Sequence, residues 1–328
     1  MRRAIVQAAF VFALAFAGDP ASAAEMGCKG LRFVFFPGGP EGGPFASVVY
    51  NGARLAARHT GCKVDYVWSD WNPEKMVRQF KEAIARRPDG ISLMGHPGEP
   101  ALGRLIEEAR AKGIIVTTAN VGLPVSEARY KSEGFGYVGQ KLYESGATLA
   151  KAAVRRCRLG SGDLALVWGL LGQEARGQRT KGVIDALKEM GLRVKYLEIS
   201  GAINKDAIQG TPVFTSFAAA NPGLKLVVTD HGALTALLGV YLRAAGKSPG
   251  QICGAGFDLS AATARAIKEG AVDAVLDQQP FLQGYLPIVQ LYLSKRFGFA
   301  GMNVDTGAAI ITSDNVDAVT SLTAEGIR

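Results

Sequence analysis

The sequence predicts an α/β protein made of two doubly wound lobes, each built on a parallel sheet. Two apolar runs, Ile91–Met94 and Ile114–Thr118, flank an amphipathic segment at residues 102–109. Apolar strands joined by an amphipathic helix form a βαβ unit, which requires a parallel sheet and a right-handed connection. This alternation runs through both halves of a 328-residue chain, which is long enough for two separate cores.

The first half of the chain alternates five expected strands with helices. The strands are expected at residues 31–36, 63–67, 91–94, 114–118 and 136–138, and the helices at 45–59, 72–87, 102–112 and 142–156. Asn72 is a good helix cap and Pro73 suits the first helical position, so the second helix has a well-defined start.

The second half repeats the pattern. The strands are expected at residues 164–168, 193–199, 224–229, 252–256 and 272–276, and the helices at 180–190, 213–220, 233–245, 260–269 and 284–295. Two successive five-strand arrays of similar length therefore favour two lobes over one large sheet.

The first 23 residues have the pattern of a secretory signal peptide. Arg2 and Arg3 form a basic start, residues 4–18 are almost entirely apolar, and Ala21-Ser22-Ala23 supplies small residues for cleavage. We expect cleavage after Ala23, with Ala24 as the alternative, and export of the mature chain. A membrane anchor is disfavoured because the apolar run is too short to span a bilayer.

The four cysteines can pair in an oxidising compartment. Cys28 and Cys62 precede the first two strands, and neighbouring parallel strands would bring them together, so we expect a Cys28–Cys62 disulfide. Cys157 and Cys253 precede or begin strands that we expect not to be adjacent, and their pairing stays open.

Composition and motifs disfavour several functional classes. The formal net charge is +8, but no basic run is present, so we interpret the charge as a solvated surface and expect no nucleic-acid partner. No cysteine or histidine spacing resembles a metal site. Residues 245–248 resemble the end of a phosphate-binding loop, but Tyr241 stands where its glycine would be. We expect no metal and no cofactor.

Polar and aromatic residues collect just past the expected strands of both lobes. Ligands of open α/β sheets bind outside the carboxyl ends of the strands, so these positions converge on one crevice. The candidate ligand-binding residues are Phe45, Trp68, His96, Asn120 and Gln140 in the first lobe and Arg176, Asp230, His231, Asp258 and Gln278 in the second.

This set of side chains favours a polyhydroxylated ligand. Planar amide, carboxylate and guanidinium groups hold hydroxyls well, and aromatic rings pack on the C–H faces of a sugar. Trp168 is a further candidate for an aromatic wall. Trp71 follows the same strand as Trp68, and at least one of the two could contact the ligand, although both could instead be packing residues. A peptide or amino acid ligand stays open.

Other assignments also have local alternatives. Asp230 and Asp258 could cap the helices that follow them instead of contacting a ligand. Either Arg176 or Arg179 could be the ligand residue, because both lie at a helix start, where basic side chains interact poorly with the helix dipole.

In its order of motifs the chain resembles the periplasmic sugar-binding proteins of ABC importers, of the ribose-binding and autoinducer-2-binding type. The segments that carry the resemblance are Pro44-Phe45, Pro88–Ile91, Gly113–Asn120, Arg176–Gly182, Leu226–His231, Gly256–Asp258 and Asp277-Gln278. The resemblance covers essentially the whole mature chain.

The resemblance implies two lobes joined by three crossover strands, with a monosaccharide bound between them. It implies an N-terminal lobe of residues 24–140 and 279–307 and a C-terminal lobe of residues 141–278 and 308–328. Hinges are expected near Gly139, Gln279 and Gly307. It further implies a monomeric periplasmic protein whose partner is a membrane permease.

Carried over by motif, the resemblance puts Phe45, Asn120, Asp258 and Gln278 at the sugar. The chain also departs from the ribose binders, since Asn120-Val121 replaces Asp-Arg and His231-Gly232 replaces Asn-Asp. The arginine of the sixth-strand loop is displaced by one residue, to Arg176, and Gly139-Gln140 looks more like the autoinducer-2 binders. A changed polar set should recognise a changed hydroxyl pattern, so we do not expect a ribose binder.

The sequence thus predicts a solute-binding component of an ABC transporter that binds a monosaccharide or related polyol by hinge closure. One alternative is an exported sugar-active enzyme that uses His96 or His231 with Asp258 or Asp230 as an acid–base pair. Another alternative is a soluble ligand sensor for a membrane receptor.

Overall fold

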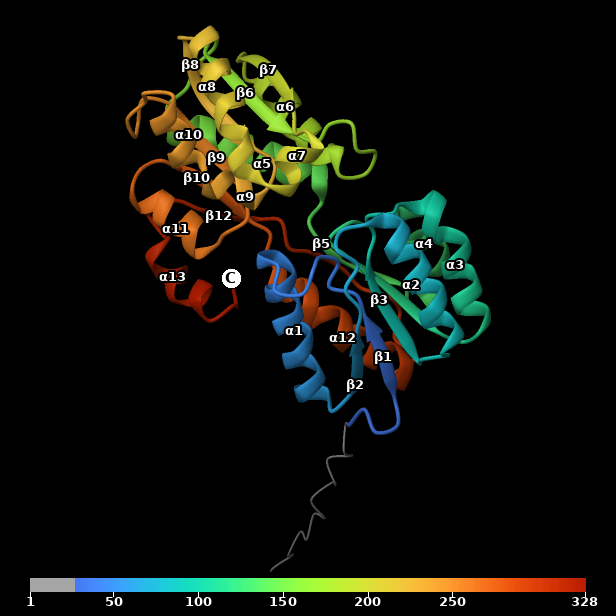
Figure 1. Cartoon of the computed structure of the whole chain (residues 1–328). Coiled ribbons are helices and arrows are strands. Elements are labelled where there is room, and N and C mark those ends of the chain that lie inside the picture. The colour runs from blue at the N-terminus through green and yellow to red at the C-terminus, as the bar shows by residue number, and fades with distance from the viewer. Residues whose placement is uncertain (1–26) are drawn as a thin grey trace, which may run out of the picture.

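The computed structural model describes residues 27–328, which form two α/β lobes (Figure 1). The expected signal peptide, residues 1–23, lies outside the described residues, as do residues 24–26. Within the described part, no helix is both long and apolar enough to cross a membrane.

The N-terminal lobe is built on a six-stranded sheet of order β11-β5-β4-β3-β1-β2. Its strands, all parallel, are β1 (Arg32–Phe35), β2 (Lys63–Tyr66), β3 (Gly90–Met94), β4 (Ile115–Ala119), β5 (Gly136–Gly139) and β11 (Asn303–Asp305). Its helices are α1 (Pro44–Thr60), α2 (Pro73–Ala85), α3 (Glu99–Ala111), α4 (Pro124–Tyr130), the 3-10 turn η1 (Lys131–Glu133) and α12 (Pro280–Phe297). Helices α1 and α12 cover one face of the sheet, and α2, α3 and α4 cover the other (Figure 1).

The C-terminal lobe has a second six-stranded sheet of order β12-β10-β9-β8-β6-β7. Its strands are β6 (Leu164–Gly169), β7 (Arg193–Glu198), β8 (Leu224–Thr229), β9 (Cys253–Phe257), β10 (Ala274–Asp277) and β12 (Ala309–Ile311). Its helices are α5 (Leu142–Arg156), α6 (Gly177–Glu189), α7 (Gly201–Lys205), the 3-10 turn η2 (Ala207–Gly210), α8 (Thr211–Ala220), α9 (Gly232–Ala236), α10 (Leu238–Ala244), α11 (Ala261–Lys268) and α13 (Asp317–Ala324). Only β12, which runs antiparallel to β10, departs from the parallel arrangement of these strands.

The chain crosses between the two sheets where strands end. It leaves the first sheet after β5, returns to it after β10, and passes again to the second sheet between β11 and β12. The predicted fold class, two doubly wound lobes joined by three crossovers, is confirmed.

The structure also corrects details of the expected elements. Each sheet has a sixth strand, β11 or β12, which is only three residues long and so gives little periodic signal. The expected helix 233–245 is divided into α9 and α10 at Leu237. Helix α12 begins at Pro280, four residues before the expected start, because Pro280 occupies a first-turn position where its missing N–H costs nothing.

All four cysteines are paired in the structure. The expected Cys28–Cys62 disulfide is present, with the Cα atoms 4.6 Å apart. Cys157 and Cys253, left open by the sequence, also form a disulfide. Their strands are not neighbours, as expected, because β8 lies between β6 and β9. The bond forms because Cys157 ends α5, a helix that packs across β9.

Candidate ligand-binding site

Three aromatic side chains gather at the carboxyl edge of the N-terminal sheet. The ring of Trp71 lies 5.8 Å from that of Phe45 and 5.0 Å from that of His96, measured between centroids. A Cβ on Gly39 would lie 2.7 Å from Nε1 of Trp71, so the glycine loop after β1 lets the indole lie directly against it. Trp71 stays 39% exposed, so this cluster offers an aromatic surface to a ligand.

Trp68 lies in a different cluster. Its ring packs 5.3 Å from that of Tyr50, and Tyr50 in turn contacts Tyr66. The structure therefore brings Trp71, the alternative that the sequence offered, next to Phe45 and His96, and it does not place Trp68 with them.

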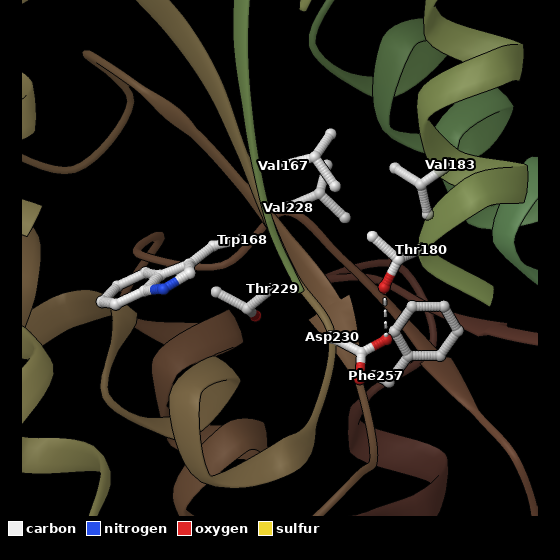
Figure 2. Close-up of a pocket in the computed structure, with 8 residues that line it drawn as sticks. All are labelled: Val167, Trp168, Thr180, Val183, Val228, Thr229, Asp230 and Phe257. Carbon is white, nitrogen blue, oxygen red and sulfur yellow. Dashed lines mark hydrogen bonds between the residues drawn. The ribbon is translucent and has the colours of Figure 1, made fainter. Parts of the chain in front are cut away.

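The expectation that Trp168 forms an aromatic wall of the cleft is wrong. Trp168 is fully buried in the core of the C-terminal lobe, with ring centroids 6.4 Å from Phe214 and 5.5 Å from Tyr241. Figure 2 shows it on the opposite side of the strand from Asp230 and Thr180. Successive residues of a strand point to opposite faces, and Trp168 points to the face that α8 and α10 cover.

A buried network of amides connects the two lobes at the crossovers. Nδ2 of Asn120, at the end of β4, donates to Oε1 of Gln278 over 2.8 Å and to Oε1 of Gln283 over 2.9 Å. Nε2 of Gln140, just after β5, donates to the same Gln278 oxygen over 3.1 Å. Gln278 in turn donates through Nε2 to Asp258, at the end of β9. Four of the predicted residues are thus joined in one chain of hydrogen bonds.

Backbone conformation helps to place these side chains. Asn120, Asp258 and Gln279 all have positive φ angles, of 63°, 70° and 53°. Asn and Asp tolerate this left-handed region better than most residues, whereas Gln does not. Strained residues of this kind are held by their surroundings and cluster at binding sites and hinges.

A buried ionic cluster occupies the matching edge of the C-terminal sheet. Nε of Arg179 donates to Oδ1 of Asp230 over 3.0 Å. The hydroxyl of Thr180 donates to the same oxygen over 3.2 Å (Figure 2). The guanidinium of Arg179 also lies 4.2 Å from the ring centroid of Phe257. Arg176 is further from Asp230, with Nε 3.5 Å from Oδ2.

The arginines decide the charge of Asp230. Burial alone would raise the pKa of this carboxyl group, but Arg179 and Arg176 together hold the pKa well below its usual range. Asp230 is therefore a carboxylate at neutral pH. In this structure Arg179 and Thr180 both donate hydrogen bonds to it.

Two histidines face the same region from opposite lobes. Burial and the nearby charges of Arg176 and Arg179 lower the pKa of His96 to about 3. Burial and Arg176 lower the pKa of His231 to about 4. Both imidazoles are therefore neutral at neutral pH.

The sequence did not identify every residue of this region. Gln283 contacts Gln278 and Asn120, yet it lies in the first turn of α12, just outside the helix that the sequence predicted. A polar side chain one turn after Pro280, in a first turn that is otherwise apolar, was the available signal. Arg179 was named only as an alternative to Arg176.

Comparison with known proteins places the chain in a family. Residues 33–294 match the family model described as a periplasmic binding protein domain. The chain therefore belongs to the periplasmic binding protein family. In that family the fold described above is a scaffold for binding a solute.

Individual relatives agree with this assignment. The xylose/arabinose-binding protein XylF of Sulfolobus acidocaldarius is 27% identical over 284 residues, which span 83% of this chain and 69% of that protein. A carbohydrate transporter structure from Acidothermus cellulolyticus, in complex with myo-inositol, has a TM-score of 0.76 at 25% identity and covers 91% of this chain and 99% of its own. An ABC transporter solute-binding protein from Burkholderia graminis, in complex with D-arabinose, shares the fold with a TM-score of 0.77 at 23% identity, covering 88% and 97%.

Proposed function

We propose that this protein is the solute-binding component of an ABC importer and that it binds a monosaccharide or related polyol between its two lobes. The family assignment and the sugar-binding relatives support the class of ligand. The proposal includes a periplasmic location, a monomeric state and docking of the loaded protein on a membrane permease.

The observation that carries the proposal is the amide network at the crossovers. Asn120, Gln140 and Gln278 offer planar groups that both donate and accept, which suits hydroxyls. The rings of Phe45 and Trp71 lie at the same edge and suit the C–H face of a sugar. A site of this composition binds a ligand by polar contacts at its edges and by packing on its faces.

The proposed mechanism is closure about the crossovers. Residues 24–140 with 279–307 would move as one body and residues 141–278 with 308–328 as the other, with hinges near Gly139, Gln279 and Gly307. A ligand that touches both lobes binds the closed form better and so shifts the population toward it.

An exported sugar-active enzyme is the second candidate, and the site does not favour it. The acid–base pair would need Asp230 or Asp258, but Asp230 is held by Arg179 and Thr180. Asp258 accepts hydrogen bonds from the backbone N–H of Gly232 and from Gln278. We expect no product when the purified protein is incubated with a panel of sugars and the mixture is examined by chromatography. A ligand sensor shares the binding chemistry, and identification of the membrane partner separates it from an importer.

A thermal-shift screen tests the binding function. Pentoses, hexoses, polyols, furanones and sugar acids are added to the purified protein, and a true ligand raises the melting temperature by mass action. Asn120→Ala or Asp258→Ala should abolish the shift, because each removes a member of the network. Asn204→Ala, on the exposed helix α7, is the matched control and should keep it. A full response in both site variants would show that the site is elsewhere.

A further inference from the structure

We infer that the ligand is a carboxylated sugar, an aldonate or uronate, whose carboxylate binds Arg176. The inference rests on the proposed function and names the ligand class of the same site. The inference is based on a comparison of the polar groups of the cleft that already form hydrogen bonds within the protein with those that do not.

The acidic groups of the site are occupied by the protein itself. Asp230 accepts hydrogen bonds from Arg179 and Thr180. Asp258 accepts the backbone N–H of Gly232 through Oδ2 over 3.0 Å and the amide of Gln278 through Oδ1. Both carboxylates therefore already have hydrogen-bond partners within the protein.

The groups that remain are mainly nitrogen atoms. Nε of Arg176, Nε2 of His231 and both ring nitrogens of His96 are buried and have no hydrogen-bond partner among residues 27–328. His231 is 91% buried, and an arginine Nε can only donate. Buried polar groups of native proteins normally have a hydrogen-bond partner. Unpaired ones at a cleft therefore indicate a ligand that forms hydrogen bonds with them.

Arg176 is less closely paired than Arg179. Arg179 forms a close ion pair with Asp230, whereas Arg176 lies 3.5 Å from that carboxylate without a hydrogen bond from Nε. Burial and repulsion from Arg179 lower the pKa of Arg176, while Asp230 and Asp258 act in the opposite direction. A carboxylate would relieve this repulsion and accept hydrogen bonds from the guanidinium in the planar geometry that arginine prefers.

The rest of the site fits the remainder of such a molecule. Trp71 and Phe45 lie beside His96 and provide a surface for the C–H groups of a sugar ring or chain. The amides of Asn120, Gln140 and Gln278 bond to one another in this structure and would exchange those bonds for bonds to its hydroxyls when the ligand enters. The ligand class thus combines one anionic end with a hydroxylated body.

Isothermal titration calorimetry on matched pairs of ligands tests the inference. D-Galacturonate is compared with D-galactose, D-glucuronate with D-glucose, and D-gluconate with sorbitol. Within each pair the carboxylate replaces an uncharged group. In at least one pair the acid should bind at least about tenfold more tightly than its neutral partner, as expected for a hydrogen bond to a charged group.

Variants of Arg176 test the residue. Arg176→Gln should weaken binding of the acid by at least about tenfold, and Arg176→Lys should restore part of the loss because it keeps the charge. Arg265→Gln, on the exposed face of α11, is the control and should change nothing. Circular dichroism melting verifies that each variant is folded.

The outcomes separate the inference from the proposed function. Tighter binding of the neutral partner in every pair that binds would overturn the carboxylate while leaving the sugar-binding function in place. Tight binding of an acid that Arg176→Gln does not weaken would overturn the role of Arg176. Binding of neither class across the whole panel would overturn the proposed function together with the inference.

Discussion

Two uncharged histidines face a region that also contains two arginines. His96 belongs to the N-terminal lobe and His231 to the C-terminal lobe, and burial together with the arginines keeps both imidazoles neutral. In an unfolded chain a histidine has a pKa of about 6.5. Folding therefore lowers the proton affinity of both side chains, and this difference links protein stability to pH.

The free energy of unfolding should fall as the pH is lowered from about 6.5 to about 4. In that window the unfolded chain binds protons at His96 and His231 that the folded protein binds only near pH 3 and pH 4, respectively. The double variant His96→Gln, His231→Gln should show a shallower decline than the parent. Urea unfolding at pH 7.0, 5.5 and 4.5 measures both slopes, and equal slopes would contradict the burial of neutral histidines.

At the scale of elements, each lobe contains a pair of helices packed through glycines. In the N-terminal lobe a Cβ on Gly284 of α12 would lie 1.8 Å from the carbonyl oxygen of Val49, and one on Gly52 of α1 would lie 2.0 Å from that of Phe281. In the C-terminal lobe Gly146 of α5 and Gly182 of α6 make the same kind of contact. Because α12 and α5 each begin directly after a crossover, these contacts fix the position of the crossovers relative to the sheets.

Gly284→Ala should destabilise the protein by about 1–3 kcal/mol or more, because the new methyl group meets backbone and forces α1 and α12 apart.

Gly103→Ala is the matched control. It lies inside α3, where a Cβ would meet only the carboxylate of Glu99 at 3.4 Å. That change should stabilise by about 0.5–1 kcal/mol through helix propensity. Chemical denaturation measures both, and a neutral Gly284→Ala would show that the helices can separate at little cost.

At the scale of the whole molecule, the last residues of the chain touch both lobes. They follow α13, which lies in the C-terminal lobe, and reach the space between α13 and α1 (Figure 1). The carbonyl oxygen of Gly326 accepts a hydrogen bond of 3.2 Å from Asn51 of α1, in the other lobe. Arg328 forms an ion pair with Asp277, a fully buried carboxylate at the end of β10 beside a crossover.

Arg328→Ala should destabilise the protein at pH 7 by about 3 kcal/mol, because it leaves a buried carboxylate without its cation. Burial raises the pKa of Asp277, and Arg328 opposes that rise. In the variant Asp277 should take up a proton more readily, so the stability difference from the parent should shrink as the pH falls. Arg328→Lys, which keeps the charge, is the control. Urea unfolding at pH 7 and pH 5 gives the difference, and a constant difference would argue against a charged Asp277.

Local pattern was sufficient for the first ten strands and most of the helices, but not for the short strands β11 and β12 or for the helices α4 and α13. Asn120, Gln140, Asp258 and Gln278 could be found because each follows a predicted strand, and the carboxyl ends of parallel strands meet at one edge. The choice between Trp68 and Trp71 could not be made in this way. Both follow the same strand and they lie only three residues apart. Only the packing of Trp71 on the glycine loop and on His96 distinguishes them.

By itself, the sequence determined the class of fold, the Cys28–Cys62 bond and the edge of each sheet that carries the polar residues. These follow from the periodicity of apolar residues and from the tendency of successive strands to lie side by side, which are local properties of the chain. Only the tertiary structure decided that Cys157 bonds Cys253, that Trp168 is a core residue, and that Arg179 forms a closer ion pair with Asp230 than Arg176 does. Those outcomes depend on which distant segments pack together, because a side chain's partners are set by the whole fold and not by its neighbours in sequence.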